Sequence, residues 1–121
     1  MSDGTLAGER KGSGNFQILV KGKAAHAGRN FASGKNAVVG AASIACALHD
    51  LNGKHNDVTV NVGAISGGSP PNVVPEFAVV RLNIRVPNEA ARQWAVEEIE
   101  RIMVTEPLAR QLGLEVSLHG S

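Results

Sequence analysis

Residues 57–86, "DVTVNVGAISGGSPPNVVPEFAVVRLNIRV", decide the fold that we predict from this sequence. The first part alternates between apolar and polar side chains, which predicts a half-buried strand over residues 57–65. Its apolar side would carry Val58, Val60, Val62 and Ala64. The β-rich segment "EFAVVRLNIRV" predicts a second strand over residues 76–86, and the connection 66–75 is too long for a tight hairpin.

A strand and then a helix are predicted before this pair. The segment "NFQILVKG" predicts a strand over residues 15–22. After a loop, apolar residues at helical spacing predict a helix over residues 34–52, with Ser33 as its N-cap and Gly53 as its stop. Many side chains of this helix are small, which allows another element to approach it closely.

A second helix and a last strand are predicted after the pair. Pro87 and Asn88 open the helix, with Asn88 as its N-cap. Its buried stripe would carry Trp94, Ile99, Ile102 and Met103. Glu97 and Arg101 are spaced for an exposed i,i+4 ion pair, and "LEVSLHG" predicts a strand over residues 114–120.

The element order β-α-β-β-α-β predicts an α+β fold of the ferredoxin-like type. Right-handed crossovers give a four-stranded antiparallel sheet in the order 4-1-3-2, with both helices on one face. Strands 57–65 and 114–120 would be its edges. We expect one compact domain over residues 15–121, preceded by a polar, glycine-rich lead-in over residues 1–14.

Composition excludes some classes of function. The formal charge is +1 with no basic block, which argues against a nucleic-acid partner. No apolar run approaches the length of a membrane span, so no membrane partner is expected, and the first residues do not resemble a signal peptide. The single Cys46, expected to be a buried structural thiol, gives no information on compartment, and the localisation stays open.

Two short segments imitate a metal site. His55 and Asp57 lie in a loop with no evident third ligand. Glu97 and Glu98 are adjacent on a helix, so their side chains diverge by about 100°. Because zinc needs three or four converging ligands, no metal site and no cofactor are predicted in this chain.

Three residues are candidates for a functional site: His26, Asn72 and Arg85. Each alone has an ordinary interpretation, because loop histidines are usually surface residues, asparagine forms turns, and arginine often ends a strand. The position of these residues in the sequence favours the functional interpretation. Long connections inside compact domains are often functional, and prolines stiffen this one around Asn72.

Two segments carry a resemblance to a known family: "GKAAHAGRNFASGKNAV" and "VNVGAISGGSPPNVVPEFAVVRLNIRV". They resemble the dimerisation (lid) domain of the M20 family of zinc-dependent metallopeptidases. The lead-in "GERKGSGNF" is similar to the glutamate carboxypeptidase branch, the carboxypeptidase G2-like enzymes. The resemblance covers residues 9–120.

The resemblance implies that this chain is a lid excised from a larger enzyme that hydrolyses N-acyl amino acids or peptides. In that family zinc lies in a separate catalytic domain, so the chain alone would be inactive. His26 matches the lid histidine that crosses the dimer to stabilise the oxyanion. Asn72 matches a substrate-binding asparagine, and Arg85 matches the arginine that pairs with a substrate carboxylate.

Strand directions add an independent expectation. Strands 15–22 and 57–65 run in parallel, so His26 and Asn72 would lie at one end of the sheet and Arg85 at the other. One site would then take Arg85 from its own lid and the other two residues from a partner. We expect a homodimer through strand 57–65 and helix 34–52, since a long unblocked edge invites pairing.

Two other interpretations remain open. Ferredoxin-like domains often bind small regulatory ligands, so a regulatory module is the main alternative. A purely structural dimerisation module differs only in that His26 would have no role in catalysis. An RNA-binding sheet is poorly supported, because stacking needs exposed aromatic residues and only Phe16 and Phe77 lie on predicted strands.

Overall fold

The computed structural model describes residues 12–109 and 112–120. Its elements are β1 (Gly12–Lys21), a 3-10 turn (Phe31–Ser33), α1 (Ala37–His49), β2 (Thr59–Gly67), β3 (Phe77–Val86), α2 (Glu89–Ala109) and β4 (Glu115–Gly120). The four strands form one sheet in the order β2-β3-β1-β4, in which every neighbouring pair is antiparallel. This is the predicted ferredoxin-like order.

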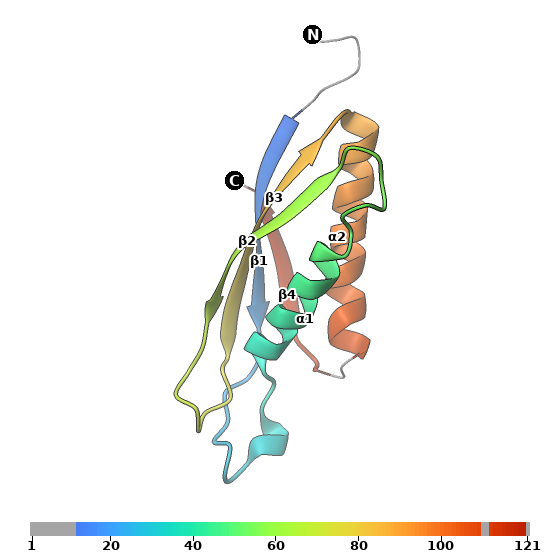
Figure 1. The fold of residues 1–121 in the computed structure, drawn as a ribbon. Coiled ribbons are helices and arrows are strands. Elements are labelled where there is room, and N and C mark those ends of the chain that lie inside the picture. Colours follow the sequence, from blue (N-terminus) through green and yellow to red (C-terminus); the bar gives the residue numbers. More distant parts are fainter. Residues whose placement is uncertain (1–11, 110–111, 121) are drawn as a thin grey trace.

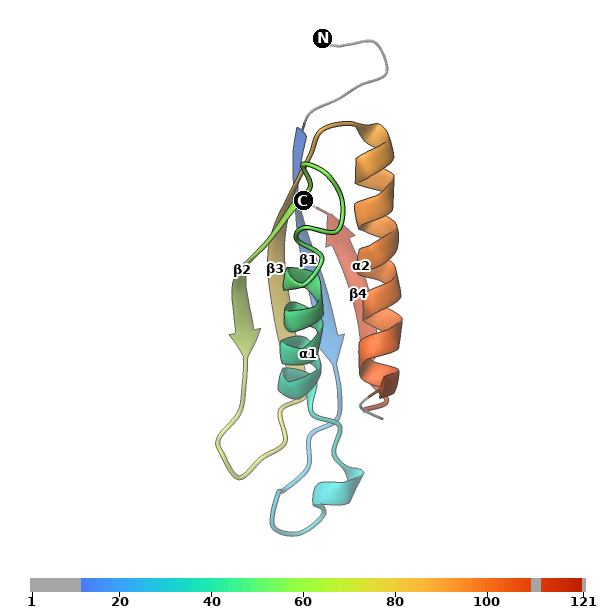
Figure 2. The same ribbon diagram turned by 45° about the vertical axis from the view of Figure 1, so that its right-hand side comes forward.

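Both helices lie on one face of the sheet (Figures 1 and 2). The core fills the space between the two layers, and its fully buried side chains come from both strands and helices: Ile18, Val20, Ile44, Leu48, Val80, Ile84, Ile99 and Ile102. The other face is open and largely polar. Asn83 on β3 donates a hydrogen bond to Asn15 on β1 across this open face, at 2.9 Å.

Helix α1 is shorter than predicted. It begins at Ala37, and the side chain of Asn36 accepts a hydrogen bond from the backbone N–H of Val39 at 3.0 Å. The expected N-cap, Ser33, lies instead in the 3-10 turn and binds Asn30. The prediction of residues 34–52 was too long because two cap-forming residues, Ser33 and Asn36, precede the same apolar run.

The predicted alternation of side chains along β2 is interrupted by a β-bulge. Val62 pairs with Leu82, but Ala64 pairs with the next residue of β3, Arg81, so Gly63 is an extra residue. Val60 and Val62 face the helices as predicted, whereas Ala64 shares the open face with Arg81. Beyond the bulge Ile65, not Ala64, lies on the helix side.

Other boundaries shift slightly. β1 begins at Gly12, inside the expected lead-in, because Gly12, Ser13 and Gly14 pair with the end of β3. The rest of that lead-in, residues 1–11, lies outside the described residues. β2 begins and ends two residues later than the predicted 57–65.

In α2 the predicted N-cap is confirmed: Asn88 accepts from the N–H of Ala91 at 2.8 Å. The predicted Glu97–Arg101 ion pair is wrong, because Arg101 pairs with Glu98 at 2.9 Å. The hydrogen bond and the charge of Glu98 raise the pKa of Arg101 above its usual value. In the described part of the chain, neither helix is long and apolar enough to cross a membrane.

Candidate substrate-binding site

The structure brings the loops of His26 and Asn72 together at one end of the sheet (Figure 2). The N–H of Ala27 donates to the carbonyl of Asn72 at 2.9 Å, and the N–H of Val74 donates to the carbonyl of Ala25 at 2.8 Å. His26 and Val73 face each other in an isolated antiparallel bridge. The two loops therefore form a short two-stranded ribbon, and the predicted proximity of His26 and Asn72 is confirmed.

The Asn72 loop is also fixed within itself and against α1. The N–H of Val73 donates to the carbonyl of Pro70 at 2.9 Å, which closes a turn around Asn72. The carbonyl of Pro75 accepts from the N–H of Ala37, the first residue of α1, at 3.0 Å. The loop is therefore ordered by hydrogen bonds, although most of it is exposed.

The His26 loop forms a tight turn closed by its own polar groups. The backbone N–H of His26 donates to the side-chain oxygen of Asn30 at 3.0 Å, and the carbonyl of His26 accepts from the N–H of Asn30 at 3.1 Å. The ring nitrogen Nδ1 of His26 accepts from the N–H of Gly28 at 3.1 Å. The imidazole is exposed at the tip, with its Nε2 without a partner among the described residues.

An apolar groove lies beside these two loops. It has a volume of about 260 Å³, and apolar or small side chains line most of it: Ala27, Phe31, Val38, Pro70, Pro71, Val73, Val74 and Pro75. Phe31, which is 63% exposed, adds an aromatic ring to this lining. The end of the sheet that carries His26 therefore also offers a surface for an apolar group.

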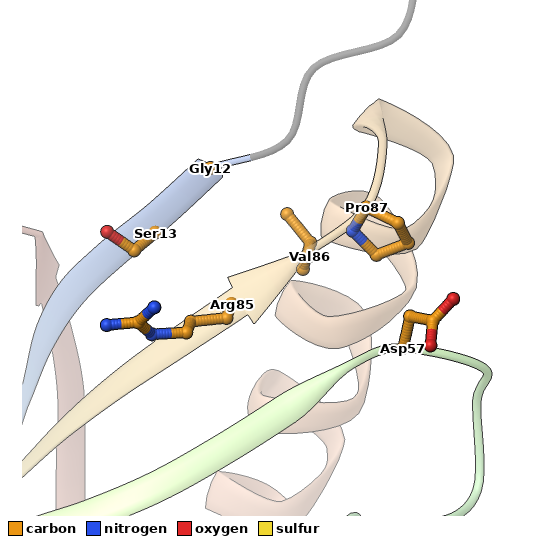
Figure 3. Close-up of a pocket in the computed structure, with 6 residues that line it drawn as sticks. All are labelled: Gly12, Ser13, Asp57, Arg85, Val86 and Pro87. Atoms are coloured by element: carbon orange, nitrogen blue, oxygen red, sulfur yellow. The ribbon is translucent and has the colours of Figure 1, made fainter.

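Arg85 lies at the opposite end of the sheet, where it faces Ser13 on β1 and Thr59 on β2 in the open-face register. It lines an open hollow together with Gly12, Ser13, Asp57, Val86 and Pro87. Figure 3 shows the guanidinium extending toward Ser13, with the Asp57 carboxylate turned away. No carboxylate among residues 12–109 and 112–120 pairs with Arg85.

The two ends of the site are far apart. Phe77, which follows the Asn72 loop, and Arg85 are eight residues apart along β3. At about 3.3 Å per residue, this separates them by roughly 26 Å. A ligand the size of one N-acyl amino acid does not reach from Arg85 to His26 of the same chain.

The described residues do not gather a metal site. No group of three or more His, Cys, Asp or Glu side chains lies together among them. His55, which the sequence places near Asp57, lies against Trp94 with ring centroids 4.8 Å apart and the ring planes tilted by 40°. Cys46, predicted to be buried, is exposed on α1, because the helix turns Ala41, Ile44 and Leu48 toward the sheet.

The free edge of β2 is partly covered by a residue that sequence reasoning missed. Asn52 donates to the carbonyl of Val60 at 2.8 Å and accepts from its N–H at 2.8 Å. The backbone groups of Val60 must therefore point away from β3, to the free edge. Since this direction alternates along a strand, the N–H and carbonyl of Val62 also point to the free edge.

Helix α1 packs beside β2 and carries several exposed small or apolar side chains (Figure 2). Val39 is 43% exposed, and Ala42 and Cys46 follow it at helical spacing. Ile65 on β2 is 49% exposed. Exposed small or apolar side chains thus occur on both β2 and α1.

Residues 8–110 match the family model of the M20 peptidase dimerisation domain. The chain belongs to this family. It is 31% identical over 118 residues to one subunit of the p-aminobenzoyl-glutamate hydrolase of Escherichia coli, covering 91% of this chain and 27% of that protein. It is 31% identical over 107 residues to indole-3-acetyl-aspartic acid hydrolase of Enterobacter agglomerans, covering 88% and 24%.

A solved structure supports the same relationship. The aminobenzoyl-glutamate utilization protein from Klebsiella pneumoniae matches with a TM-score of 0.82 and 29% identity, over 91% of this chain and 28% of that one. This chain spans about a quarter of the length of these relatives. The remaining three quarters of each relative have no counterpart in this chain.

Proposed function

We propose that this chain is the dimerisation and substrate-binding lid of an M20-family hydrolase that cleaves N-acyl amino acids or peptides, in the manner of glutamate carboxypeptidases. It self-associates through β2 and α1 and supplies His26 to the active site of the partner subunit. The zinc of the parent enzyme is held by a separate catalytic domain, because the described residues offer no ligand set for it.

One observation carries this proposal: the chain holds His26 and Asn72 at one end of the sheet and Arg85 at the other. Because one small substrate does not span that distance, the two groups serve different active sites. A two-fold dimer is consistent with this arrangement, because the same surface of each lid contacts its own copy. Each active site then receives Arg85 from one lid and His26 with Asn72 from the other.

The three side chains suit the hydrolysis of an amide next to a carboxylate. Arg85 offers a planar pair of donors to the carboxylate of the amino-acid part. Asn72 can donate to and accept from the polar backbone of the substrate. His26 donates a hydrogen bond to the carbonyl oxygen as negative charge develops on it. The relatives named for p-aminobenzoyl-glutamate and indole-3-acetyl-aspartate have substrates of this kind.

The decisive experiment mixes two variants of the full-length parent. Subunits with His26→Ala and subunits with Arg85→Ala are each expected to be impaired as homodimers. In a mixed dimer, one site takes intact Arg85 from one protomer and intact His26 from the other. Random pairing should therefore restore about a quarter of the wild-type activity at low substrate concentration. If both residues served the same protomer's site, no activity would return on mixing.

The His26→Ala homodimer measures the role of His26 itself. Loss of one donor to an oxyanion typically lowers kcat by about 10²–10³-fold, so we expect a loss of this order with unchanged unfolding. His119→Ala is the matched control, because it removes an exposed imidazole from β4. A normal kcat for His26→Ala would indicate that the chain is a purely structural dimerisation module.

A further inference from the structure

We propose that the turn 26–30 fixes the neutral imidazole of His26 as the tautomer with its proton on Nε2, and that Gly28 and Asn30 are positioning residues for this donor. Its consequence for catalysis rests on the proposed function of His26. The tautomer itself is a property of this chain alone.

The tautomer follows from one hydrogen bond. The N–H of Gly28 lies 3.1 Å from Nδ1 of His26. A backbone N–H only donates, so Nδ1 must accept and carries no proton. A neutral imidazole then has its single proton on Nε2, the nitrogen at the outer side of the ring.

The turn that makes this hydrogen bond is fixed by Asn30 rather than by burial. Its side-chain oxygen accepts from the N–H of His26 at 3.0 Å, while its own N–H donates to the carbonyl of His26 at 3.1 Å. This pair of bonds closes the chain around Gly28 and aims the Gly28 N–H at the ring. The backbone carbonyl of Asn30 in turn accepts from Ser33, which ties the turn to the 3-10 segment before α1.

A proton held on Nε2 suits the role that we propose for His26. An Nε2–H can donate to a carbonyl oxygen that gains negative charge. The other tautomer would present a lone pair to that oxygen, which would repel it. Holding Nδ1 as an acceptor therefore keeps His26 in the form that stabilises the transition state, without requiring that the ring be charged.

The test is long-range ¹H–¹⁵N correlation NMR of this 121-residue chain at about pH 8.5, where imidazole is ordinarily neutral. We expect Nδ1 of His26 to behave as an unprotonated nitrogen, with a larger Nε2–H fraction than His49. His49 is the internal reference, since its exposed ring makes no hydrogen bond in the described residues. An equal or smaller Nε2–H fraction at His26 would overturn the proposal.

Two variants at one position show whether Asn30 is responsible. Asn30→Ala removes the acceptor for the His26 N–H and should move the His26 tautomer fraction toward that of His49. Asn30→Asp keeps an oxygen at the same place and should retain the wild-type fraction. If both variants kept the wild-type fraction, Asn30 would not be a positioning residue.

The two proposals fail separately. Were the NMR result as expected while the mixed dimers stayed inactive, the turn would fix the tautomer but His26 would not act across the dimer. Were the mixed dimers active while His26 and His49 showed equal tautomer fractions, His26 would act in the partner's site without this positioning. In the parent, Asn30→Ala should lower kcat more than it changes KM, and Asn30→Asp should restore kcat.

Discussion

At the scale of single residues, Arg85 gives the clearest prediction. Arg85→Ala in the parent should raise KM for substrates that carry a carboxylate and leave kcat nearly unchanged, because it removes binding already present in the ground state. A hydrogen bond to a charged group contributes about 1.5–3 kcal/mol, which corresponds to a rise in KM of about ten- to a hundredfold. Steady-state kinetics over a range of substrate concentrations measure this effect.

The matched control is Arg81→Ala. Arg81 is also exposed on the open face of β3, but it does not line the hollow around Arg85. Its loss should leave KM unchanged. An equal rise in KM for both variants would indicate general electrostatic attraction of the substrate rather than a carboxylate site at Arg85.

The sequence was sufficient to predict which residues lie at the same end of the sheet, because strand direction alone determines this. Strands β1 and β2 run in the same direction, so the loops that follow them lie at the same end of the sheet. The proximity of His26 and Asn72 therefore followed from the element order. Cys46 was placed wrongly, because the alanines around it gave no indication of which face of α1 meets the sheet. The contacts of Gly28 and Asn30 with His26 depend on the backbone of one tight turn, for which the sequence gives no periodic signal.

At the scale of elements, Asn52 connects the end of α1 to β2. Its side chain makes both hydrogen bonds of the Val60 backbone and also donates to the carbonyl of His49 at 2.9 Å. Asn52→Ala would leave the part-buried N–H and carbonyl of Val60 without these partners. We expect a loss of about 1–3 kcal/mol in the free energy of unfolding, measured by urea titration.

Asn56→Ala is the control for this variant, since Asn56 lies in the same connection with an exposed side chain that makes no hydrogen bond in the described residues. It should change the free energy of unfolding by less than about 0.5 kcal/mol. Equal stability of the two variants would show that water replaces the Asn52 side chain without cost.

The sequence identified each helix and strand but not their irregularities. Alternation predicted β2 up to Val62 and failed at Gly63, because a bulge inserts one residue and reverses the side that follows. Asn52 was interpreted only as the last residue of a helix. Its role depends on β2 returning beside the helix end, which is a tertiary contact.

At the scale of the whole molecule, the free edge of β2 predicts how two lids meet. Asn52 occupies the edge at Val60, so pairing with a second copy begins at Val62. Val62→Pro removes a donor that points to the free edge and spares the ladder with β3. We expect the variant to dissociate at concentrations where the wild-type chain is dimeric, as measured by sedimentation equilibrium over a concentration series.

Val62→Thr is the matched control, because it has a similar shape and keeps the backbone N–H. It should dimerise like the wild type. A strictly monomeric wild type at high concentration, or a Val62→Pro variant that dimerises normally, would contradict the model of pairing through β2.

The fold of the whole molecule was the part best predicted from sequence. Six elements in this order, with right-handed crossovers, permit few sheets, and the antiparallel order β2-β3-β1-β4 is the one observed. The hydrogen-bonded contact between the His26 and Asn72 loops needed more than the sheet. It required both connections to be ordered, which backbone hydrogen bonds achieve in each and prolines assist around Asn72.

The pairing of β1 with β4 has a mechanical consequence. Phe16 near the start of β1 lies opposite Gly120 at the end of β4, so the chain enters and leaves the sheet at the same end on adjacent strands. Tension between these two points would load the hydrogen bonds of this pair one at a time, starting at Phe16, rather than all together. The short β4 would peel away first, while β1, β2 and β3 stayed joined. A pull from a neighbouring domain would thus unzip one edge of the lid before it disturbed the turn that holds His26.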